Sequence, residues 1–286
     1  GPRGAERGVS GVGGGGVILN NLFARVVVGL TDGLGNQLFQ FATAFAVASR
    51  ISAPLDLDIS WYRAPPQSAT TRSLGVTRLL SDNMYRNIIF RGAGWRIYDR
   101  MKRAAPPFKH SAFRFGLPAF YFPPRKADIS LYINQPAFIS GCPFNFRLFA
   151  DELPTICKDI HANLNKFRPE GAADKEYAFV HIRRGDFISN EAFRRRFDIL
   201  GTDYFQKAMS AYEKKNGKTL WVLCSDESAE AEKILPRGFN VAHSPAETEL
   251  EEIYVMANAL GGVISNSTFS FWGALLNQAP KPMIVA

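Results

Sequence analysis

Residues 25–59 read RVVVGLTDGLGNQLFQFATAFAVASRISAPLDLDI, which is the pattern of a βαβ unit. β-Branched residues at 25–30 predict a buried strand, and the glycines after them predict a tight loop. Apolar side chains then recur at intervals of about three and four over residues 36–50, which predicts a helix packed on a sheet. Residues 55–59 predict a second, parallel strand. This segment therefore indicates an α/β fold.

The same alternation of short apolar strands and helices returns after residue 170. Strands are predicted at 177–182, 220–224 and 262–265, and helices at 203–215, 247–259 and 268–278. Such alternation is typical of a second parallel α/β unit, so we predict two Rossmann-like halves with parallel sheets. The predicted parts are a flexible glycine-rich start at 1–24, an N-terminal domain with an acceptor-side region at 25–168, and a C-terminal nucleotide-binding domain at 169–286.

The composition is that of a globular protein with a basic surface. The 286 residues are 46% hydrophobic and 21% charged, with a formal net charge of +8. This charge favours anionic partners, which include nucleotide diphosphates, phospholipid headgroups and nucleic acids. No run of about 18 apolar residues is present, and the three cysteines have no pairing or metal-binding spacing. We therefore expect a cytoplasmic protein, peripheral at a membrane, or a membrane-anchored one if the N-terminus is truncated.

The loop of residues 29–37 joins the first predicted strand to the first helix. Its glycines allow a ligand to approach the backbone, and the free N–H groups of the helix start favour an anionic or polar group. Gly35, Asn36 and Gln37 are therefore candidate ligand-binding residues. A tight βα turn without a ligand is the alternative.

The run HIRRGD at 181–186 lies where a predicted strand ends, and open α/β sheets bind ligands at that edge. Strand alternation places His181 and Arg183 on one side and Arg184 on the other. An arginine here can hold a diphosphate with two parallel hydrogen bonds while Asp186 holds a neighbouring group. An exposed ion-pair network is the alternative.

Two further strand ends carry polar side chains. Asp226 follows the strand at 220–224 and suits a ribose hydroxyl or a base N–H, with helix capping as the alternative. The run SNSTFS at 265–270 lies at a strand-to-helix junction, where a phosphate is favoured. Asp56 and Asp58 fit a loose Asp-x-Asp metal pattern, and we interpret them as strand residues because so short a pattern often arises by chance.

In chain order, these motifs resemble those of the α-1,2-fucosyltransferases of glycosyltransferase family 11. They are GNQLFQ at 35–40, HIRRGD at 181–186, SDE at 225–227 and NSTFSFWG at 266–273. The resemblance implies a GT-B-like fold and an inverting transfer of L-fucose from GDP-β-L-fucose to a galactose hydroxyl in α-1,2 linkage. The implied partners are GDP-fucose and a galactose-terminated oligosaccharide or glycolipid, without nucleic acid. No metal or other cofactor is expected.

The resemblance also implies residue roles. Arg183 and His181 contact the diphosphate and guanosine, Asp226 binds guanine or ribose, and Asn36 faces the reacting sugar. The remaining substrate-binding predictions are Gly35, Gln37, Arg184, Asn266, Ser267, Thr268 and Ser270, of which Ser267, Thr268 and Ser270 are expected to line the phosphates. Arg183 stabilises the departing GDP, and the general base is left open between Asp186 and Glu191.

The motifs depart from the family pattern at a few positions. Asp32 stands where the family has a further glycine, so we expect this loop to face fucose or acceptor rather than phosphate. Phe187, Phe271 and Leu275 replace a tyrosine and two tryptophans.

Two other functions fit parts of the sequence. An NAD(P)-dependent oxidoreductase of the short-chain type would use the glycines of the first loop, with Asp56 or Asp58 for ribose, but it leaves the motifs after residue 181 unexplained. A non-catalytic module that binds carbohydrate or nucleic acid would use the basic charge.

Overall fold

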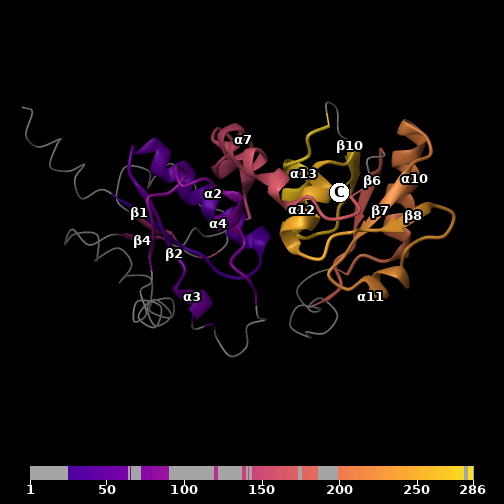
Figure 1. The fold of residues 1–286 in the computed structure, drawn as a ribbon, viewed down its shortest axis with the longest axis horizontal. Coiled ribbons are helices and arrows are strands. Elements are labelled where there is room, and N and C mark those ends of the chain that lie inside the picture. Colours follow the sequence, from indigo (N-terminus) through magenta and orange to yellow (C-terminus); the bar gives the residue numbers. More distant parts are fainter. Residues whose placement is uncertain are drawn as a thin grey trace, which may run out of the picture.

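The computed structural model describes residues 25–63, 65, 72–89, 119–121, 137–139, 141, 144–172, 176–185, 199–279 and 283–285. The described residues form two parallel five-stranded sheets that lie side by side (Figure 1). The predicted α/β class with two parallel sheets is therefore confirmed.

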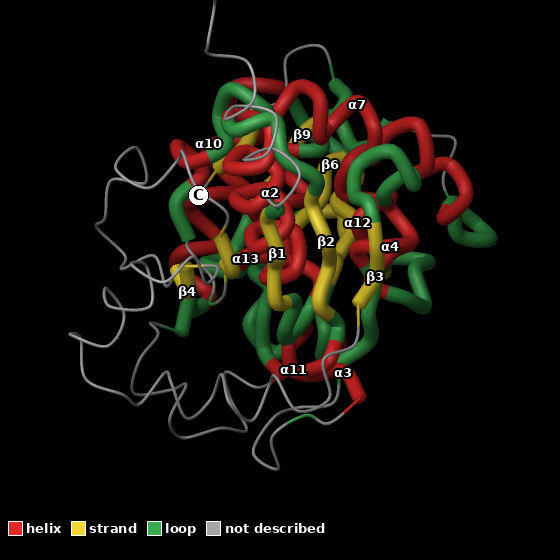
Figure 2. Tube along the Cα trace, turned by 90° about the vertical axis from the view of Figure 1, so that its left-hand side faces the viewer, coloured by secondary structure: helices red, strands yellow, loops and turns green. Residues whose placement is uncertain are grey.

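The first sheet is built around β1, whose four valine and glycine residues are all buried. Its strand order is β3-β2-β1-β5-β4, and all its neighbouring strands are parallel. In Figure 2, β1, β2 and β3 run side by side at the front. The strands are β1 Val26–Gly29, β2 Leu55–Asp58, β3 Asn87–Ile89, β4 Ala119–Tyr121 and β5 Ala137–Ile139.

The second sheet has the order β10-β9-β6-β7-β8 and is also parallel throughout. Its central strand, β6, is buried along its length, as expected for a strand covered on both faces. The strands are β6 Ala178–His181, β7 Leu220–Cys224, β8 Asn240–His243, β9 Gly261–Val263 and β10 Met283–Val285.

Helices lie between and around the two sheets (Figure 1). They are α2 Leu34–Arg50, α3 Ser60–Arg63, α4 Val76–Leu79, α7 Leu153–Leu164, α10 Thr202–Asn216, α11 Ser228–Glu232, α12 Glu249–Ala257 and α13 Thr268–Leu275, with 3-10 turns at Phe146–Leu148 and Asn165–Phe167. No helix in this described part of the chain is long and apolar enough to cross a membrane.

The helix α2 packs on two sides at once, against β1 and against α13 of the C-terminal half. A helix covered on both sides must be apolar nearly all round, and α2 is buried at most positions from Leu34 to Ala48. Phe39 stacks on Phe271 with ring centroids 5.3 Å apart and meets Trp272 edge-on at 5.6 Å. One apolar core therefore continues from the first sheet into the second half of the chain.

Candidate functional site

His181, the last residue of β6, is a buried and neutral imidazole. Its side chain is nearly inaccessible, and its Nδ1 lies 2.9 Å from the Ser265 hydroxyl that follows β9. Burial, and then the charge of Arg183, lower the pKa of His181 to about 3. The ring therefore joins two neighbouring strand ends and brings no positive charge to the site at neutral pH.

The low pKa of His181 predicts a loss of stability in acid. Its pKa is about 3 in the folded protein against 6.5 for an ordinary histidine, so the unfolded chain takes up the proton first. The stabilising contribution is complete above pH 6.5 and is lost as the pH falls toward 3. We expect this group to lower the free energy of unfolding by up to about 1.4 kcal/mol per pH unit below pH 6.

Urea unfolding of the wild type and of His181→Gln between pH 7.5 and 4.5 measures this contribution. The variant should lose stability less steeply than the wild type. Equal slopes for His181→Gln and the wild type would show that the buried imidazole is not the source.

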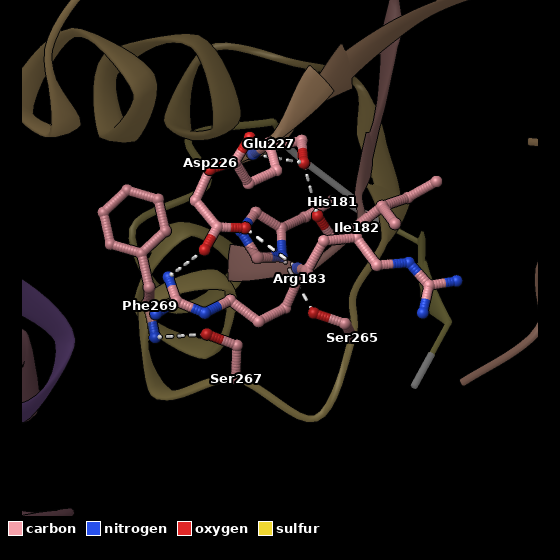
Figure 3. A network of polar contacts seen from close by, with 10 residues as sticks. His181, Ile182, Arg183, Asp226, Glu227, Ser265, Ser267 and Phe269 are labelled. Carbon is pink, nitrogen blue, oxygen red and sulfur yellow. Dashed lines mark hydrogen bonds and ion pairs between the residues drawn. The ribbon is translucent and has the colours of Figure 1, made fainter. Parts of the chain in front are cut away.

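Arg183 and Asp226 form a charged pair at the carboxyl edge of the second sheet. Arg183 Nη1 lies 3.1 Å from Asp226 Oδ2, and the two side chains are only 15% and 20% exposed. The other carboxylate oxygen, Oδ1, accepts the backbone N–H of Arg184 at 2.9 Å. Figure 3 shows the Arg183 side chain extending toward the first turn of α13. Asp226 thus uses both oxygens to hold the chain after β6 and to orient Arg183.

Gly185 allows this close approach of the two loops. A Cβ atom at Gly185 would overlap Asp226 Oδ2, so a larger residue would push the carboxylate away from Arg183. The glycine in HIRRGD is therefore explained by packing against a carboxylate, which the motif alone does not reveal.

Arg184 points away from Arg183, as strand alternation predicts. It is 5% exposed, and its Nη2 donates to the carbonyl oxygen of Leu200 at 3.2 Å. Burial lowers its pKa. Its Nε has no hydrogen-bond partner within the residues that the structure describes. This predicted substrate-binding residue lies against the body of the C-terminal half.

The polar run before α13 builds the start of that helix. Ser267 Oγ caps α13 by accepting the N–H of Phe269 at 3.3 Å, and the buried Ser270 hydroxyl contacts the carbonyl oxygens of Ser265 and Ser267 at 3.2 Å each. Asn266 is exposed at the turn. The hydroxyls therefore shape the turn, and the Ser267 cap already uses one N–H group of the helix start, that of Phe269.

The first turns of α2 and α13 meet directly between the two sheets. Thr268 Oγ1 donates to Asn36 Oδ1 at 2.8 Å. A Cβ atom at Gly35 would lie 2.5 Å from the backbone nitrogen of Phe269, so the two helices approach through the glycine. Because the N-terminal end of a helix is its positive end, two positive ends lie together there. Arg183 extends toward the same turn of α13 (Figure 3).

Gln37 is fully buried, and its amide group is used within the protein. Its Nε2 donates to the carbonyl oxygens of Asp32 at 2.9 Å and Ser73 at 2.8 Å. Its Oε1 accepts the N–H groups of Gly75 and Val76 at 3.0 Å each. These bonds occupy both donors and both acceptor positions, so Gln37 fixes the glycine loop and caps α4.

The backbone at Asp32 adopts a conformation that favours glycine. Its φ is +64°, in the left-handed region, and its carbonyl oxygen accepts hydrogen bonds from the Tyr62 hydroxyl at 2.8 Å and from Gln37. These contacts hold the backbone in a conformation that costs an L-residue about 1–2 kcal/mol. The Asp32 side chain is exposed and accepts the Thr31 hydroxyl at 2.8 Å.

We expect Asp32→Gly to be more stable than Asp32→Ala by about 1 kcal/mol. Both variants lose the carboxylate, so the difference isolates the backbone conformation. Urea unfolding measures it. The same pair of substitutions at Lys207, exposed in α10, should give the opposite order because alanine favours helices. Equal stability of the two Asp32 variants would contradict the prediction.

The Asp-x-Asp pair lies within β2, and its interpretation as strand residues is confirmed. Asp56 accepts Asn87 Nδ2 at 2.8 Å and pairs with Arg25 at 3.3 Å. Asp58 accepts the N–H of Ser60 at 3.0 Å. Across the described ranges, no group of three or more His, Cys, Asp or Glu residues is arranged to hold a metal ion.

Both residues considered for the general base, Asp186 and Glu191, lie outside the described residues. The same holds for Phe187. Their predicted roles therefore stay predictions.

Glu252, a partly buried residue in the first turn of α12, was not among the predicted site residues. Burial raises its pKa to about 7, with Asp226 and Glu249 adding to the rise, while the backbone of Ser225 and the charge of Arg183 lower it. A lone glutamate in a helix has no motif that could have drawn attention to it. The structure brings it beside the Arg183–Asp226 pair.

Comparison with known sequences places the chain among glycosyltransferases. Residues 144–285 match the profile of "Glycosyl transferase family 11". The O-antigen biosynthesis glycosyltransferase WbnK of Escherichia coli is 25% identical over 297 residues, covering 90% of this chain and 92% of that protein. An alpha-1,2-colitosyltransferase of Escherichia coli is 23% identical over 280 residues, covering 91% and 90% of the two chains.

Solved structures share the fold at low sequence identity. Arabidopsis thaliana FUT1, in complex with GDP, gives a TM-score of 0.53 at 13% identity, covering 96% of this chain and 71% of that one. The fucosyltransferase NodZ from Bradyrhizobium gives 0.50 at 15% identity, covering 88% and 93%. The predicted GT-B-like architecture is thereby confirmed.

Proposed function

We propose that the protein is a glycosyltransferase that transfers L-fucose from GDP-β-L-fucose to a glycan hydroxyl, because residues 144–285 match the profile of glycosyl transferase family 11. The observation that carries this proposal is the placement of Arg183. Asp226 holds it at 3.1 Å on a sheet edge, and it extends toward the start of α13 (Figure 3).

This arrangement suits the departure of a nucleoside diphosphate. When the acceptor oxygen bonds to C1 of fucose, the bond from C1 to the β-phosphate oxygen breaks and negative charge grows on GDP. A guanidinium group fixed beside a helix N-terminus stabilises that charge without rearrangement during the reaction. We therefore propose that Arg183 and the α13 backbone act on the leaving group, and that no metal ion is required.

The proposed transfer inverts the configuration at C1, from the β-linked donor to an α-linked product. The acceptor hydroxyl then gives up its proton, and a carboxylate is the expected receiver. Asp186 and Glu191 are the proposed candidates. Asn36, held by Thr268 at 2.8 Å where the two halves meet, is proposed to face the reacting sugar.

The relatives support a narrower proposal for linkage and acceptor. One is an O-antigen biosynthesis glycosyltransferase and the other an alpha-1,2-colitosyltransferase. We propose α-1,2 transfer to a galactose-terminated oligosaccharide or glycolipid. The basic charge of +8 would favour a peripheral position at an anionic membrane surface.

The oxidoreductase alternative finds little support in the geometry. Gly35 packs against α13 rather than opening toward a cofactor, and Asp56 and Asp58 are engaged inside the first sheet. A non-catalytic binding module would bind its ligand without turnover of GDP-fucose, so an activity assay distinguishes this alternative from the transferase.

The decisive experiment measures GDP release from GDP-fucose in EDTA, with a panel of galactose-ended acceptors and matched reactions without acceptor. Acceptor-dependent release in EDTA is the expected result, followed by an α-1,2-linked product on methylation analysis. GDP-colitose serves as a second donor because one relative transfers colitose. Absence of turnover together with absence of GDP-fucose binding would overturn the proposed function.

A further inference from the structure

The Asp32 carboxylate ends a chain of hydrogen bonds that begins in the core of the first half. The buried Gln40 amide donates from Nε2 to Thr31 Oγ1 at 2.8 Å, and its Oε1 accepts the Thr31 N–H at 2.9 Å. The Thr31 hydroxyl then donates its own hydrogen to Asp32 Oδ2 at 2.8 Å. Two buried residues therefore fix the direction of an exposed carboxylate.

The second oxygen of this carboxylate keeps its acceptor capacity. Among the residues that the structure describes, Asp32 Oδ1 accepts no hydrogen bond and the Asp32 carboxylate forms no ion pair. A carboxylate offers about four acceptor positions on its two oxygens, and Thr31 uses one of them. The backbone φ of +64° is one that glycine adopts freely, and other residues held in this region concentrate at functional sites. Asp32 is therefore oriented for a ligand at some cost to the fold.

The loop that contains Asp32 lies where the first half meets α12 of the second half. Gln37 Nε2 donates to the carbonyl oxygens of both Asp32 and Ser73, and Ser73 Oγ donates to Glu249 Oε1 of α12 at 2.9 Å. Tyr62, whose hydroxyl donates to the Asp32 carbonyl oxygen, lies near both acidic side chains. Burial, and then the charges of Asp32 and Glu249, raise the pKa of Tyr62. The Asp32 carboxylate is thus at the junction of the two halves.

The charges at this junction favour an uncharged sugar over a phosphate. Two carboxylates, Asp32 and Glu249, would repel a diphosphate, whereas sugar hydroxyls donate hydrogen bonds to a carboxylate. The guanidinium and helix start proposed to hold the diphosphate, at Arg183 and α13, belong to the second half. Asp32 makes its own hydrogen bonds within the first half. The sugar that reaches Asp32 is therefore expected to be the acceptor.

We propose that Asp32 binds the acceptor sugar, with Oδ1 accepting a hydrogen bond from a hydroxyl group other than the one that is fucosylated. This inference rests on the proposed function and deepens it, because it assigns a residue that determines acceptor specificity. A hydrogen bond from a hydroxyl to a carboxylate is stronger than one between neutral groups. An acceptor that lacks this hydroxyl should therefore be used about tenfold or more less efficiently.

Steady-state kinetics on the full chain tests the contact with the best acceptor of the galactose-ended panel and with its monodeoxy analogues. Asp32→Gly removes the carboxylate and suits the left-handed backbone, and Asp32→Asn also tolerates that backbone but keeps one acceptor oxygen. We expect Asp32→Gly to raise the KM for the acceptor about tenfold or more, and Asp32→Asn to raise it less. The KM for GDP-fucose should not change. The control Asp151→Asn alters an exposed carboxylate that pairs with Arg50, at the other end of α2, and should behave as the wild type.

The deoxy analogues identify the hydroxyl that Asp32 binds. One analogue should have a lower kcat/KM than the parent acceptor with the wild type and with Asp151→Asn, and the two acceptors should be used equally by Asp32→Gly. If Asp32→Gly discriminates among the acceptors as the wild type does, or if only the KM for GDP-fucose changes, the inference is overturned and the proposed function stands. If the wild type shows neither acceptor-dependent turnover nor GDP-fucose binding, the proposed function fails and the inference fails with it.

Discussion

Replacement of Arg183 by alanine should lower kcat for fucosyl transfer by about 10²–10³-fold, the effect of removing one preorganised donor from a developing negative charge. Asp226 holds the guanidinium group at 3.1 Å before substrate arrives, so little reorganisation is needed when GDP departs. Arg183→Lys keeps the charge but loses the planar pair of donors, and it should retain about a tenth of the activity. Steady-state kinetics with GDP-fucose, together with calorimetry for GDP, measures both effects.

Two controls separate this role from a structural one. Arg237→Ala removes an exposed arginine and should leave kcat unchanged. Because Arg183→Ala leaves the Asp226 carboxylate without its guanidinium partner, thermal unfolding of the variant should be recorded beside the kinetics. Normal GDP affinity and turnover in a folded Arg183→Ala protein would contradict the role of Arg183 and weaken the whole assignment.

Much of the fold could be predicted because its central strands and helices have strong periodic patterns. The three consecutive valines of β1 and the apolar spacing of α2 lie at the middle of the first sheet. The edge strand β3 was not predicted, since it has only three residues, too few for a periodic pattern, and they are largely exposed. The near-complete burial of α2 could not be foreseen, because it depends on packing against α13 more than 200 residues later.

The candidate site was predictable at its strand ends and less so at its loops. Arg183 and Asp226 each follow a strand, and the parallel sheet brings such ends to one edge. The glycine loop was expected to bind a ligand. The side-chain amide of Gln37 in this loop instead makes four hydrogen bonds within the protein. Sequence alone cannot tell whether a glycine admits a ligand or another helix, because both require the same absence of a side chain.

Gly35→Ala should destabilise the protein by about 2 kcal/mol, even though alanine is the better helix former. The new Cβ would lie 2.5 Å from the backbone nitrogen of Phe269 and 2.7 Å from Thr268 Oγ1. Backbone atoms cannot rotate away, so α2 and α13 must separate. The start of α13 then moves relative to Arg183, and we expect kcat to fall by at least about tenfold, since displacements near 1 Å at a reacting group are costly.

Gly201→Ala is the matched control for this prediction. Gly201 also stands at the start of a helix, α10, but a Cβ atom there meets nothing within 4 Å. The stability and activity of the Gly201→Ala variant should stay near the wild-type values. Urea unfolding and initial rates compare the two variants under the same conditions. If Gly35→Ala is as stable and as active as Gly201→Ala, then the two halves do not depend on the close approach of α2 and α13, and the geometry of the donor site must come from the second sheet alone.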